Sequence, residues 1–264
     1  NMLEFLKNST FRANDVVFRA LNILRRHYIS IAGLCFMLFA TSTLSTFLAL
    51  YLGDLGGDVL KVVLLLAFIV LFFGLQLVLI KRAVLLANGI EHAPFLDYLP
   101  SVKQFMNFIF GLIIYSVLLP TVYLICSLLC MPLLYIDVEI DTILWEINPL
   151  LTGITMMLIL IRISFFPFFI LEKGFNILKA FKLSIAFTKG NVVNLLVMML
   201  ILAIAYIFQL TFEYFDYGIL AKISGLLNTF VIIPSVSVVM AIAYVDMIKE
   251  YKGTEDPEFF KSII

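Results

Sequence analysis

Residues 162–191 read RISFFPFFILEKGFNILKAFKLSIAFTKGN, and this stretch decides how the rest of the chain is organised. An apolar segment ends at residues 168–171, a short segment of mixed apolar and basic side chains follows, and a new apolar run begins at Val192. This order is typical of a helix that leaves a membrane, a helix that lies in the headgroup plane, and a helix that enters the bilayer again.

The composition requires a membrane around the chain. Of its 264 residues, 63% are hydrophobic, the mean hydropathy is +1.10, and the formal net charge is zero. A soluble domain is about half apolar, so this excess cannot all be buried in one protein core. The balanced charge gives no indication of a nucleic-acid partner. We therefore expect an all-α integral membrane protein with lipids as partners.

Six apolar runs are long enough to cross a bilayer, which takes about 20 helical residues. Short turns rich in Gly, Asp or Glu join the first run to the second, the third to the fourth and the fifth to the sixth. The pattern predicts a single membrane domain over residues 1–250, with six transmembrane helices as three hairpins, and a polar cytoplasmic tail at 251–264. The predicted spans are 28–52, 59–80, 105–132, 145–168, 192–212 and 219–245.

The positions of Lys and Arg predict the orientation, because cytoplasmic loops carry an excess of basic residues. With the N-terminus inside, 15 of the 18 basic residues fall in inner segments, and the others are Arg162, Lys61 and Lys222. Both termini are therefore expected on the cytoplasmic side.

Three short amphipathic segments precede the three hairpins, beginning at Phe18, Phe95 and Phe181. We expect them to form cytoplasmic interfacial helices whose basic side chains attract anionic headgroups, at ~1 kcal/mol each. The similarity of the segments indicates a threefold repeat; the alternative is that any membrane protein with hairpins and basic inner loops has basic residues at these places. The predicted lipid contacts are Arg19, Arg25, Arg26, Lys103, Lys179, Lys182 and Lys189.

Residues 174–189, which include the start of the third segment, are predicted to form a helix near the membrane plane. Its three lysines are expected to extend outward from one side of the helix. The apolar side chains expected on the opposite side, against the bundle or the acyl chains, are Ile177, Leu178, Phe181 and Ile185.

Arg162 is the most informative single residue, because an arginine inside a span is costly and is usually paired or functional. If the fourth span begins at Ile143, Arg162 anchors at the interface, and Pro167 lets the segment FFPFFIL turn along the membrane surface. If the span begins at Ile147, Arg162 lies deeper and faces a cavity. The candidate partners within the bundle are Gln76, Gln209, Asn228 and Asp246.

The sequence contains no pattern of catalytic or metal-binding residues. Cys126 and Cys130 share a helix face, but two thiols are too few for a zinc site. His27 and His92 lie at the cytoplasmic edge without metal-ligand spacing, and the chain has no HExxH, Walker or GxSxG motif. We therefore expect no cofactor, no metal site and no enzymatic activity.

The stretch 162–191 also resembles a known group of proteins. The residues that carry the resemblance are Arg162, Pro167, the EKG turn at 172–174, Ala180, Ser184, Lys189 and Gly190. They are similar to a family of six-span bacterial proteins that includes the membrane domain attached to some glycerophosphodiester phosphodiesterases and related uncharacterised inner-membrane proteins. The resemblance implies six spans and a bacterial inner membrane. These residues include no counterpart of the catalytic barrel, so phosphodiesterase activity is not implied.

Two functions are compatible with these patterns. The first is a non-enzymatic scaffold, assembly factor or lipid-associated component of the inner membrane, with a further membrane protein as a partner. The second is a transporter or channel subunit for a small or amphiphilic solute, with Arg162 in the pathway. A polar cavity that reaches Arg162 and is lined by Gln209 and Asn228 would favour the second, and a closed apolar bundle would favour the first.

Overall fold

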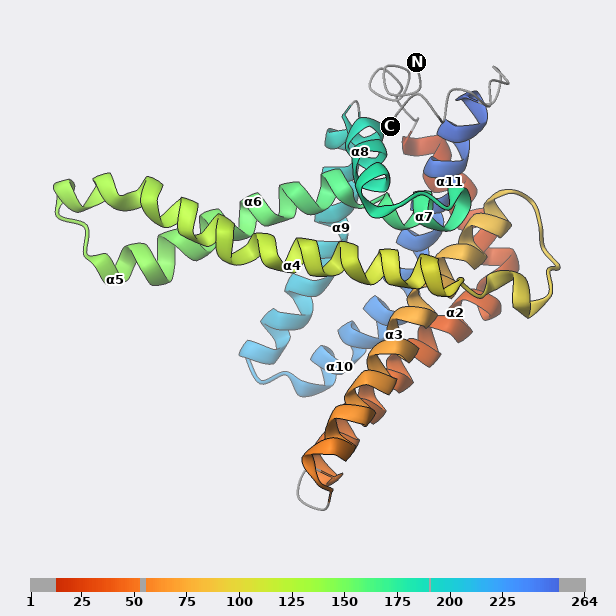
Figure 1. Ribbon diagram of the computed structural model, residues 1–264, viewed down its shortest axis with the longest axis horizontal. Helices are drawn as coiled ribbons and strands as arrows, with labels where there is room; N and C mark the ends of the chain where they lie inside the picture. The colour runs from red at the N-terminus through yellow and green to blue at the C-terminus, as the bar shows by residue number, and fades with distance from the viewer. Residues whose placement is uncertain (1–12, 53–55, 190, 252–264) are drawn as a thin grey trace.

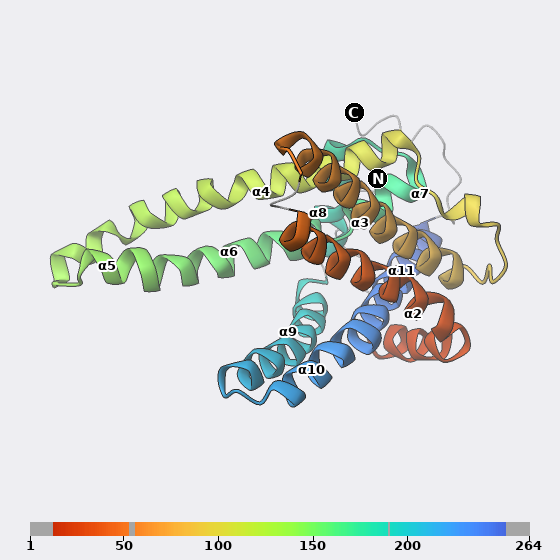
Figure 2. The same cartoon turned by 90° about the horizontal axis from the view of Figure 1, so that it is seen from below.

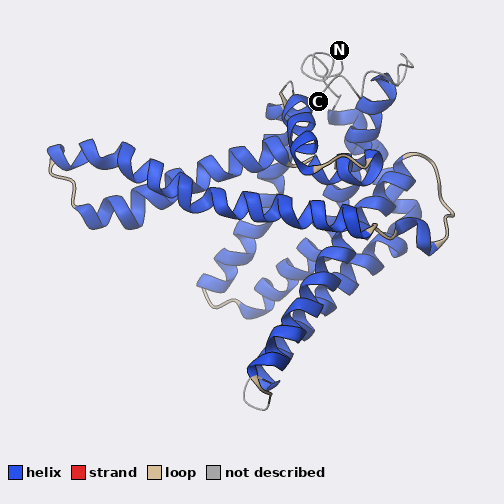
Figure 3. Cartoon of the chain, viewed as in Figure 1, coloured by secondary structure: helices blue, strands red, loops and turns tan. Residues whose placement is uncertain are grey.

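The computed structural model describes residues 13–52, 56–189 and 191–251. These residues form helices joined by short turns, and no strand occurs among them (Figure 3). Six of the described helical stretches are long and apolar enough to cross a membrane. The prediction of an all-α chain with six candidate spans is therefore confirmed. The predicted polar tail lies outside the described residues, apart from Tyr251 at the end of the last helix.

The helices have the following bounds in chain order, where η1 and η2 are 3₁₀ turns and η3 and η4 are π-helical turns: α2 (Ala13–Leu52), α3 (Asp58–Ala87), η1 (Phe95–Tyr98), α4 (Val102–Cys130), η2 (Met131–Ile136), α5 (Ile140–Thr142), η3 (Ile143–Ile147), α6 (Asn148–Ile163), α7 (Phe166–Lys173), α8 (Ile177–Thr188), α9 (Val192–Tyr214), α10 (Gly218–Leu227), η4 (Asn228–Ile232) and α11 (Ile233–Tyr251).

Long helices that follow one another in the chain lie side by side: α2 with α3, α4 with α6, and α9 with α10. The pairs do not form one parallel bundle. Figures 1 and 2 both show the α4–α6 pair running away from the rest of the molecule, while the other two pairs extend in different directions. Helix α11 packs against both α2 and α3. The pairs therefore meet at one end, and their far ends stand apart.

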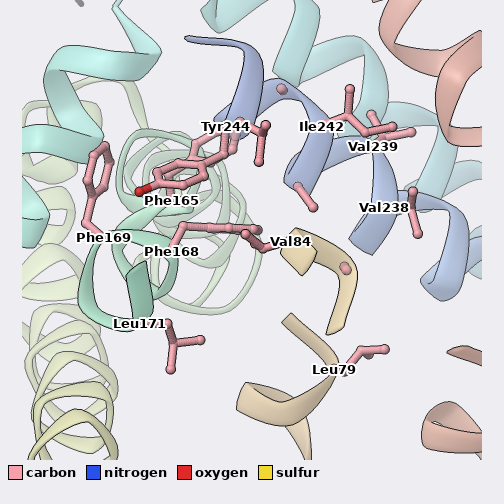
Figure 4. Close-up of a cluster of buried hydrophobic side chains, with 14 of the residues drawn as sticks. Leu79, Val84, Phe165, Phe168, Phe169, Leu171, Val238, Val239, Ile242 and Tyr244 are labelled. Atoms are coloured by element: carbon pink, nitrogen blue, oxygen red, sulfur yellow. The ribbon is translucent and has the colours of Figure 1, made fainter. Parts of the chain in front are cut away.

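The main apolar core lies where the pairs meet, and we call this region the hub. Most of its buried side chains come from α2, α3, α7, α8 and α11, and α4, α6 and α9 add Phe108, Ile161 and Leu195. Aromatic rings fill its centre: the ring centroids of Phe165 and Phe187 are 4.3 Å apart, and Tyr244 of α11 lies 5.2 Å from Phe169 and 5.3 Å from Phe168. Figure 4 shows Phe165, Phe168, Phe169 and Tyr244 gathered at one place. Aromatic pairs in such geometries add to the stabilisation that apolar burial gives.

The segment FFPFFIL, which turns along the membrane surface in the first alternative for the fourth span, is covered by protein in the structure. Residues 165–171 are all buried. The chain breaks after α6, and α7 turns into the space beside α3, α4 and α8. Burial of a large apolar side chain gives about 1.5–3 kcal/mol relative to exposure in water, and protein covers these rings as well as acyl chains would. The break therefore directs the segment into the hub.

The three segments before the hairpins do not have one common structure. The first belongs to α2, which bends at His27, where φ is −121° and ψ is 24°. The second contains only the 3₁₀ turn η1, because Pro94 and Pro100 bracket it and a residue before proline avoids the helical region. The third is the separate helix α8. The expected interfacial helix before the second hairpin does not form.

Candidate functional site

The break between α6 and α7 brings polar groups into the apolar hub. Arg162 lies in the last turn of α6, one residue before its end, and Ser164 and Phe165 form the turn. Helix α7 then begins at Phe166 with Pro167 in its first turn. Proline suits this position because the first N–H groups of a helix have no partner within the helix. The sequence thus ends one helix and starts another without a long loop.

Two hydroxyl groups of α8 hold this break. The Ser184 hydroxyl donates to the Arg162 carbonyl oxygen at 2.9 Å and accepts from the Phe165 N–H at 3.0 Å. The Thr188 hydroxyl has the same Arg162 carbonyl at 3.2 Å and its own helix's Ser184 carbonyl at 3.0 Å. Both side chains are fully buried. Backbone groups freed by the break therefore find side-chain partners instead of water.

The Arg162 side chain also turns to α8. Its Nε donates to the Thr188 hydroxyl at 3.1 Å, and its Nη2 donates to the Ile185 carbonyl at 3.0 Å. Among the described residues, none of the four predicted partners hydrogen-bonds to Arg162: Gln76, Gln209, Asn228 and Asp246. These four lie on α3, α9, η4 and α11, whereas the end of α6 faces α8. Arg162 bonds to α8 instead of the predicted partners, because the chain turns at the break and brings α8 back against α6.

Two of the predicted partners have other contacts. Asp246 receives hydrogen bonds from Arg19, with Nη1 to Oδ1 at 3.0 Å, and Gln209 donates to Glu213 at 3.4 Å. Gln209 and Asn228 do line one cavity together, of about 700 Å³, between α9, α10 and α2. Arg162 is not among its lining residues. This cavity therefore does not join Arg162 to Gln209 and Asn228, as the transporter hypothesis would require.

The end of α7 is held by side chains from two other helices. Glu172 accepts from Lys81 of α3, with Nζ to Oε1 at 2.8 Å, and Gln104 of α4 donates to the Leu171 carbonyl at 3.3 Å. Gly174 ends the helix with a left-handed φ of 65°, which an L side chain rarely adopts. In the EKG turn, Glu172 therefore links α7 to α3, and Gly174 allows the backbone to end the helix.

The basic residues predicted to contact lipids differ in exposure. The exposed members of the set are Arg25, Arg26, Lys103, Lys182 and Lys189. Lys179 is half-buried, with its ammonium 4.4 Å from the centroid of the Phe175 ring. Arg19 is occupied by carboxylates, since Asp15 lies 3.3 Å from its Nε in addition to the contact with Asp246. The prediction for Arg19 is therefore corrected to a helix-to-helix ion pair.

The exposed face of α8 is not the one expected. Leu178 and Ile185 are 66% and 42% exposed, on the side that also carries Lys182. Positions three and four apart share one helix face, so these apolar side chains lie beside the lysines and not opposite them. The face against the hub carries small and apolar side chains instead, namely Ala180, Leu183, Ser184 and Phe187.

Arg82 and Asn148 are among the buried polar residues that sequence reasoning missed. Arg82 in α3 is only 8% exposed, and its Nε donates to the Ser30 hydroxyl at 2.9 Å. Asn148 in α6 has no exposed surface; it donates to the Tyr123 carbonyl at 3.2 Å and to Ser127, and it accepts from Thr152 at 3.0 Å. The sequence signal for Arg82 was its place beside Lys81 at a span end, where it looked like one more basic edge residue.

No family model, no curated protein and no solved structure matches this chain. The resemblance on residues 162–191 therefore stays a hypothesis. The structural contacts of Arg162, Glu172, Gly174 and Ser184 give those positions physical reasons that do not depend on it.

Proposed function

We propose that the protein is a non-enzymatic scaffold or assembly factor of the bacterial inner membrane, which acts through the surfaces of its helix hairpins. The observation that carries this proposal is how little the spans are covered by the chain itself. In the most apolar part of α9 only 6% of the residues are buried. In the fourth candidate span, Ile140–Lys173, the buried share is 56%. The corresponding share is 17% for α3. Lipid or another chain has to cover these faces.

The use of the polar groups supports a role without solute passage. Arg162 is held by Thr188 and a backbone carbonyl of α8, and Asn148 is held by α4. Asn148 is fully buried and hydrogen-bonded, and buried polar groups of this kind stabilise helix contacts, while Arg162 is partly exposed and donates to α8 through Nε and Nη2. Groups occupied in this way are poor candidates for binding sites along a transport pathway.

The proposed orientation has the hub at the cytoplasmic interface and both termini inside. The exposed basic side chains of the hub end, including Lys182 and Lys189 on α8, would then lie near anionic headgroups. Leu178 and Ile185 on the same face would contact the acyl boundary, with the lysine stems extending past them. This mixture of side chains fits a helix in the interface and is the support for its lipid association.

One observation favours the alternative function, a transporter or channel subunit. The cavity of about 700 Å³ that Gln209 and Asn228 line also includes Glu213 and Lys222. Polar and charged groups at a cavity between membrane helices could bind a small or amphiphilic solute. Nothing supports a place for Arg162 in such a pathway, because Arg162 does not line that cavity.

Site-specific photo-cross-linking in native membranes tests the proposal. A photoreactive residue would replace one exposed side chain on each pair: Leu66 on α3, Leu124 on α4 and Ile204 on α9, with buried Leu183 as the control position. A scaffold predicts a discrete protein adduct from at least one pair and none from position 183. Lipid adducts alone from all three pairs would contradict the scaffold. Solute flux into proteoliposomes that is lost in Gln209→Leu would support the alternative.

A further inference from the structure

A second cavity, of about 510 Å³, opens between α2, α3 and the connection that leads to α4. Ser30 and Leu34 of α2, Val78 and Arg82 of α3, and Phe95 and Tyr98 of η1 are among its lining residues. Its volume is within the range of small-molecule sites in proteins. It lies at the hub end of the first hairpin, apart from the break between α6 and α7.

The cavity has a buried guanidinium in its wall. Arg82 Nε donates to the Ser30 hydroxyl at 2.9 Å, and Nη1 donates to the Glu91 carbonyl at 3.1 Å and to the Tyr98 hydroxyl at 2.5 Å. These three acceptors fix the plane of the group. Within the described part of the chain, Nη2 donates no hydrogen bond. The side chain is therefore oriented by neutral partners and keeps donors to spare.

Arg82 also has no carboxylate partner among the described residues. Glu91 also lines the cavity, but its carboxylate lies 3.3 Å from His27 Nε2. By contrast, Lys81 beside it pairs with Glu172, and Arg19 pairs with two aspartates. A buried charge is normally paired because its removal from water is expensive. The missing partner is thus an anion that the described chain does not provide.

Other donors face the same space. The Ser30 and Tyr98 hydroxyls accept from Arg82, which leaves the hydrogen of each hydroxyl available to a further acceptor. His92 also lines the cavity. A guanidinium flanked by hydroxyl donors is the arrangement that binds the oxygens of a phosphate group, and arginine is especially suited to this because its donors form a planar fork.

The walls indicate an amphiphilic source for that phosphate. Leu34, Val78 and Phe95 give the cavity an apolar side. Ile29 and Leu96, which neighbour the lining residues Ser30 and Phe95 in sequence, are 86% and 76% exposed, as expected for side chains that contact a membrane. A phospholipid would fit both features, with its phosphate at Arg82 and its upper acyl chain along Leu34 and Val78.

We propose that this cavity is a binding site for the phosphate group of a membrane phospholipid, with Arg82 as the principal ligand and Ser30 and Tyr98 as supporting donors. The inference goes beyond the scaffold function, because it holds whether or not the hairpins bind other proteins. It differs from diffuse attraction between surface lysines and headgroups, since it assigns one lipid to one buried arginine.

Native mass spectrometry of the full chain released from detergent tests the site. The probes are phosphatidylglycerol and a diacylglycerol with the same acyl chains, and inorganic phosphate is examined separately by thermal shift. The variants are Arg82→Gln, Tyr98→Phe and Ala93→Phe, which adds bulk at the cavity wall and leaves the charge in place. Lys61→Gln is the matched control, because it removes one exposed positive charge outside the cavity at a residue that is not among the predicted lipid contacts.

We expect one phosphatidylglycerol to remain bound to the wild type and to Lys61→Gln. Loss of charge-assisted hydrogen bonds in Arg82→Gln should weaken that binding about tenfold or more, and Ala93→Phe should weaken it even if Arg82→Gln fails to fold. Equal binding of diacylglycerol, or unchanged binding in both folded variants, would overturn the site. Stabilisation by inorganic phosphate that needs Arg82, without specific lipid binding, would support the phosphate site and overturn the lipid as its source.

Discussion

The hydroxyl of Ser184 donates to the carbonyl oxygen of Arg162 at 2.9 Å, across the gap between two helices and without any exposed surface. The same hydroxyl accepts from the N–H of Phe165, on the other side of the break. One hydroxyl thus hydrogen-bonds both to a carbonyl oxygen in the last turn of α6 and to the N–H of the residue that precedes α7. A helix break inside an apolar core needs such a partner, because an unpaired backbone group there costs about 1–3 kcal/mol.

Ser184→Ala is expected to lower the free energy of unfolding by about 1–3 kcal/mol, because the buried Phe165 N–H loses its partner and the Arg162 carbonyl keeps only the longer contact with Thr188. Thermal or denaturant unfolding in detergent measures the change. Thr155→Ala is the control, since the Thr155 hydroxyl is exposed and bonds only to the Leu151 carbonyl of its own helix at 2.8 Å. An equal loss in both variants would show that Ser184 has no special role at the break.

Arg162→Ala should cost about 1–2 kcal/mol, and Arg162→Lys should keep most of the stability, because lysine can still donate to an oxygen on α8. A double-mutant cycle with Thr188→Val measures the interaction free energy between the Arg162 and Thr188 side chains. Additive losses would mean that the contact contributes nothing. Growth complementation separates the two functions: the scaffold predicts normal growth with Arg162→Lys, and a pathway role for Arg162 predicts a defect in a folded protein.

Gly111→Ala should destabilise the attachment of α4 to the hub. A Cβ atom at position 111 would lie 2.6 Å from Phe166 Cε2 and 2.6 Å from Ile177 Cδ1. Overpacking of this kind costs about 1–3 kcal/mol. Gly153→Ala is the matched control in α6, where an added Cβ meets nothing within 4 Å. There the substitution should be neutral or slightly stabilising, as alanine favours helix over glycine. The same loss at both positions would contradict close packing at Gly111.

The Arg19–Asp246 pair should tie the first helix to the last only weakly. The two side chains are 43% and 28% exposed, so solvent screens the attraction and a contribution of about 1 kcal/mol or less is expected. Arg19→Asp and Asp246→Arg should each lower the melting temperature, and the exchanged double variant should recover part of the loss. The effect should shrink in high salt. No recovery in the double variant would refute a direct pair.

The proposed orientation predicts which positions a membrane-impermeant thiol reagent reaches from outside whole cells. Thr142→Cys should be labelled and Lys179→Cys should not. The background should be low, because Cys35, Cys126 and Cys130 are all buried. Labelling at position 179 without labelling at 142 would reverse the orientation.

The number of spans could be predicted because length and hydropathy alone decide it, and α8 lies within the predicted helix 174–189. The burial of residues 165–171 in protein could not be predicted from the sequence. Side chains that face lipid and side chains that face protein are equally apolar in a membrane protein, so hydropathy does not separate them. Pro94 and Pro100, by contrast, are visible in the sequence as residues that interrupt helices. They account for the short turn η1 where a helix was expected.

The polar contacts were harder to predict from sequence. Arg162 was singled out by its chemistry, but its partners depend on how α8 folds back, which no spacing in the sequence encodes. Arg82 was overlooked because a basic residue beside Lys81 at a span end has an ordinary explanation. Only its burial and its neutral partners distinguish it from the exposed residues Arg25 and Arg26.

The packing of α11 against α2 has a consequence for biosynthesis. Arg19 and Asp246 are 227 positions apart, so at ribosomal speeds of about 5–20 residues per second the first helix waits roughly 10–50 s for its partner to be translated. During that time the first hairpin is inserted with its hub-facing side uncovered. Lipid or the insertion machinery has to shield that side until the last helix arrives, and a ribosome that stalls before α11 would leave the hairpin without its native neighbour.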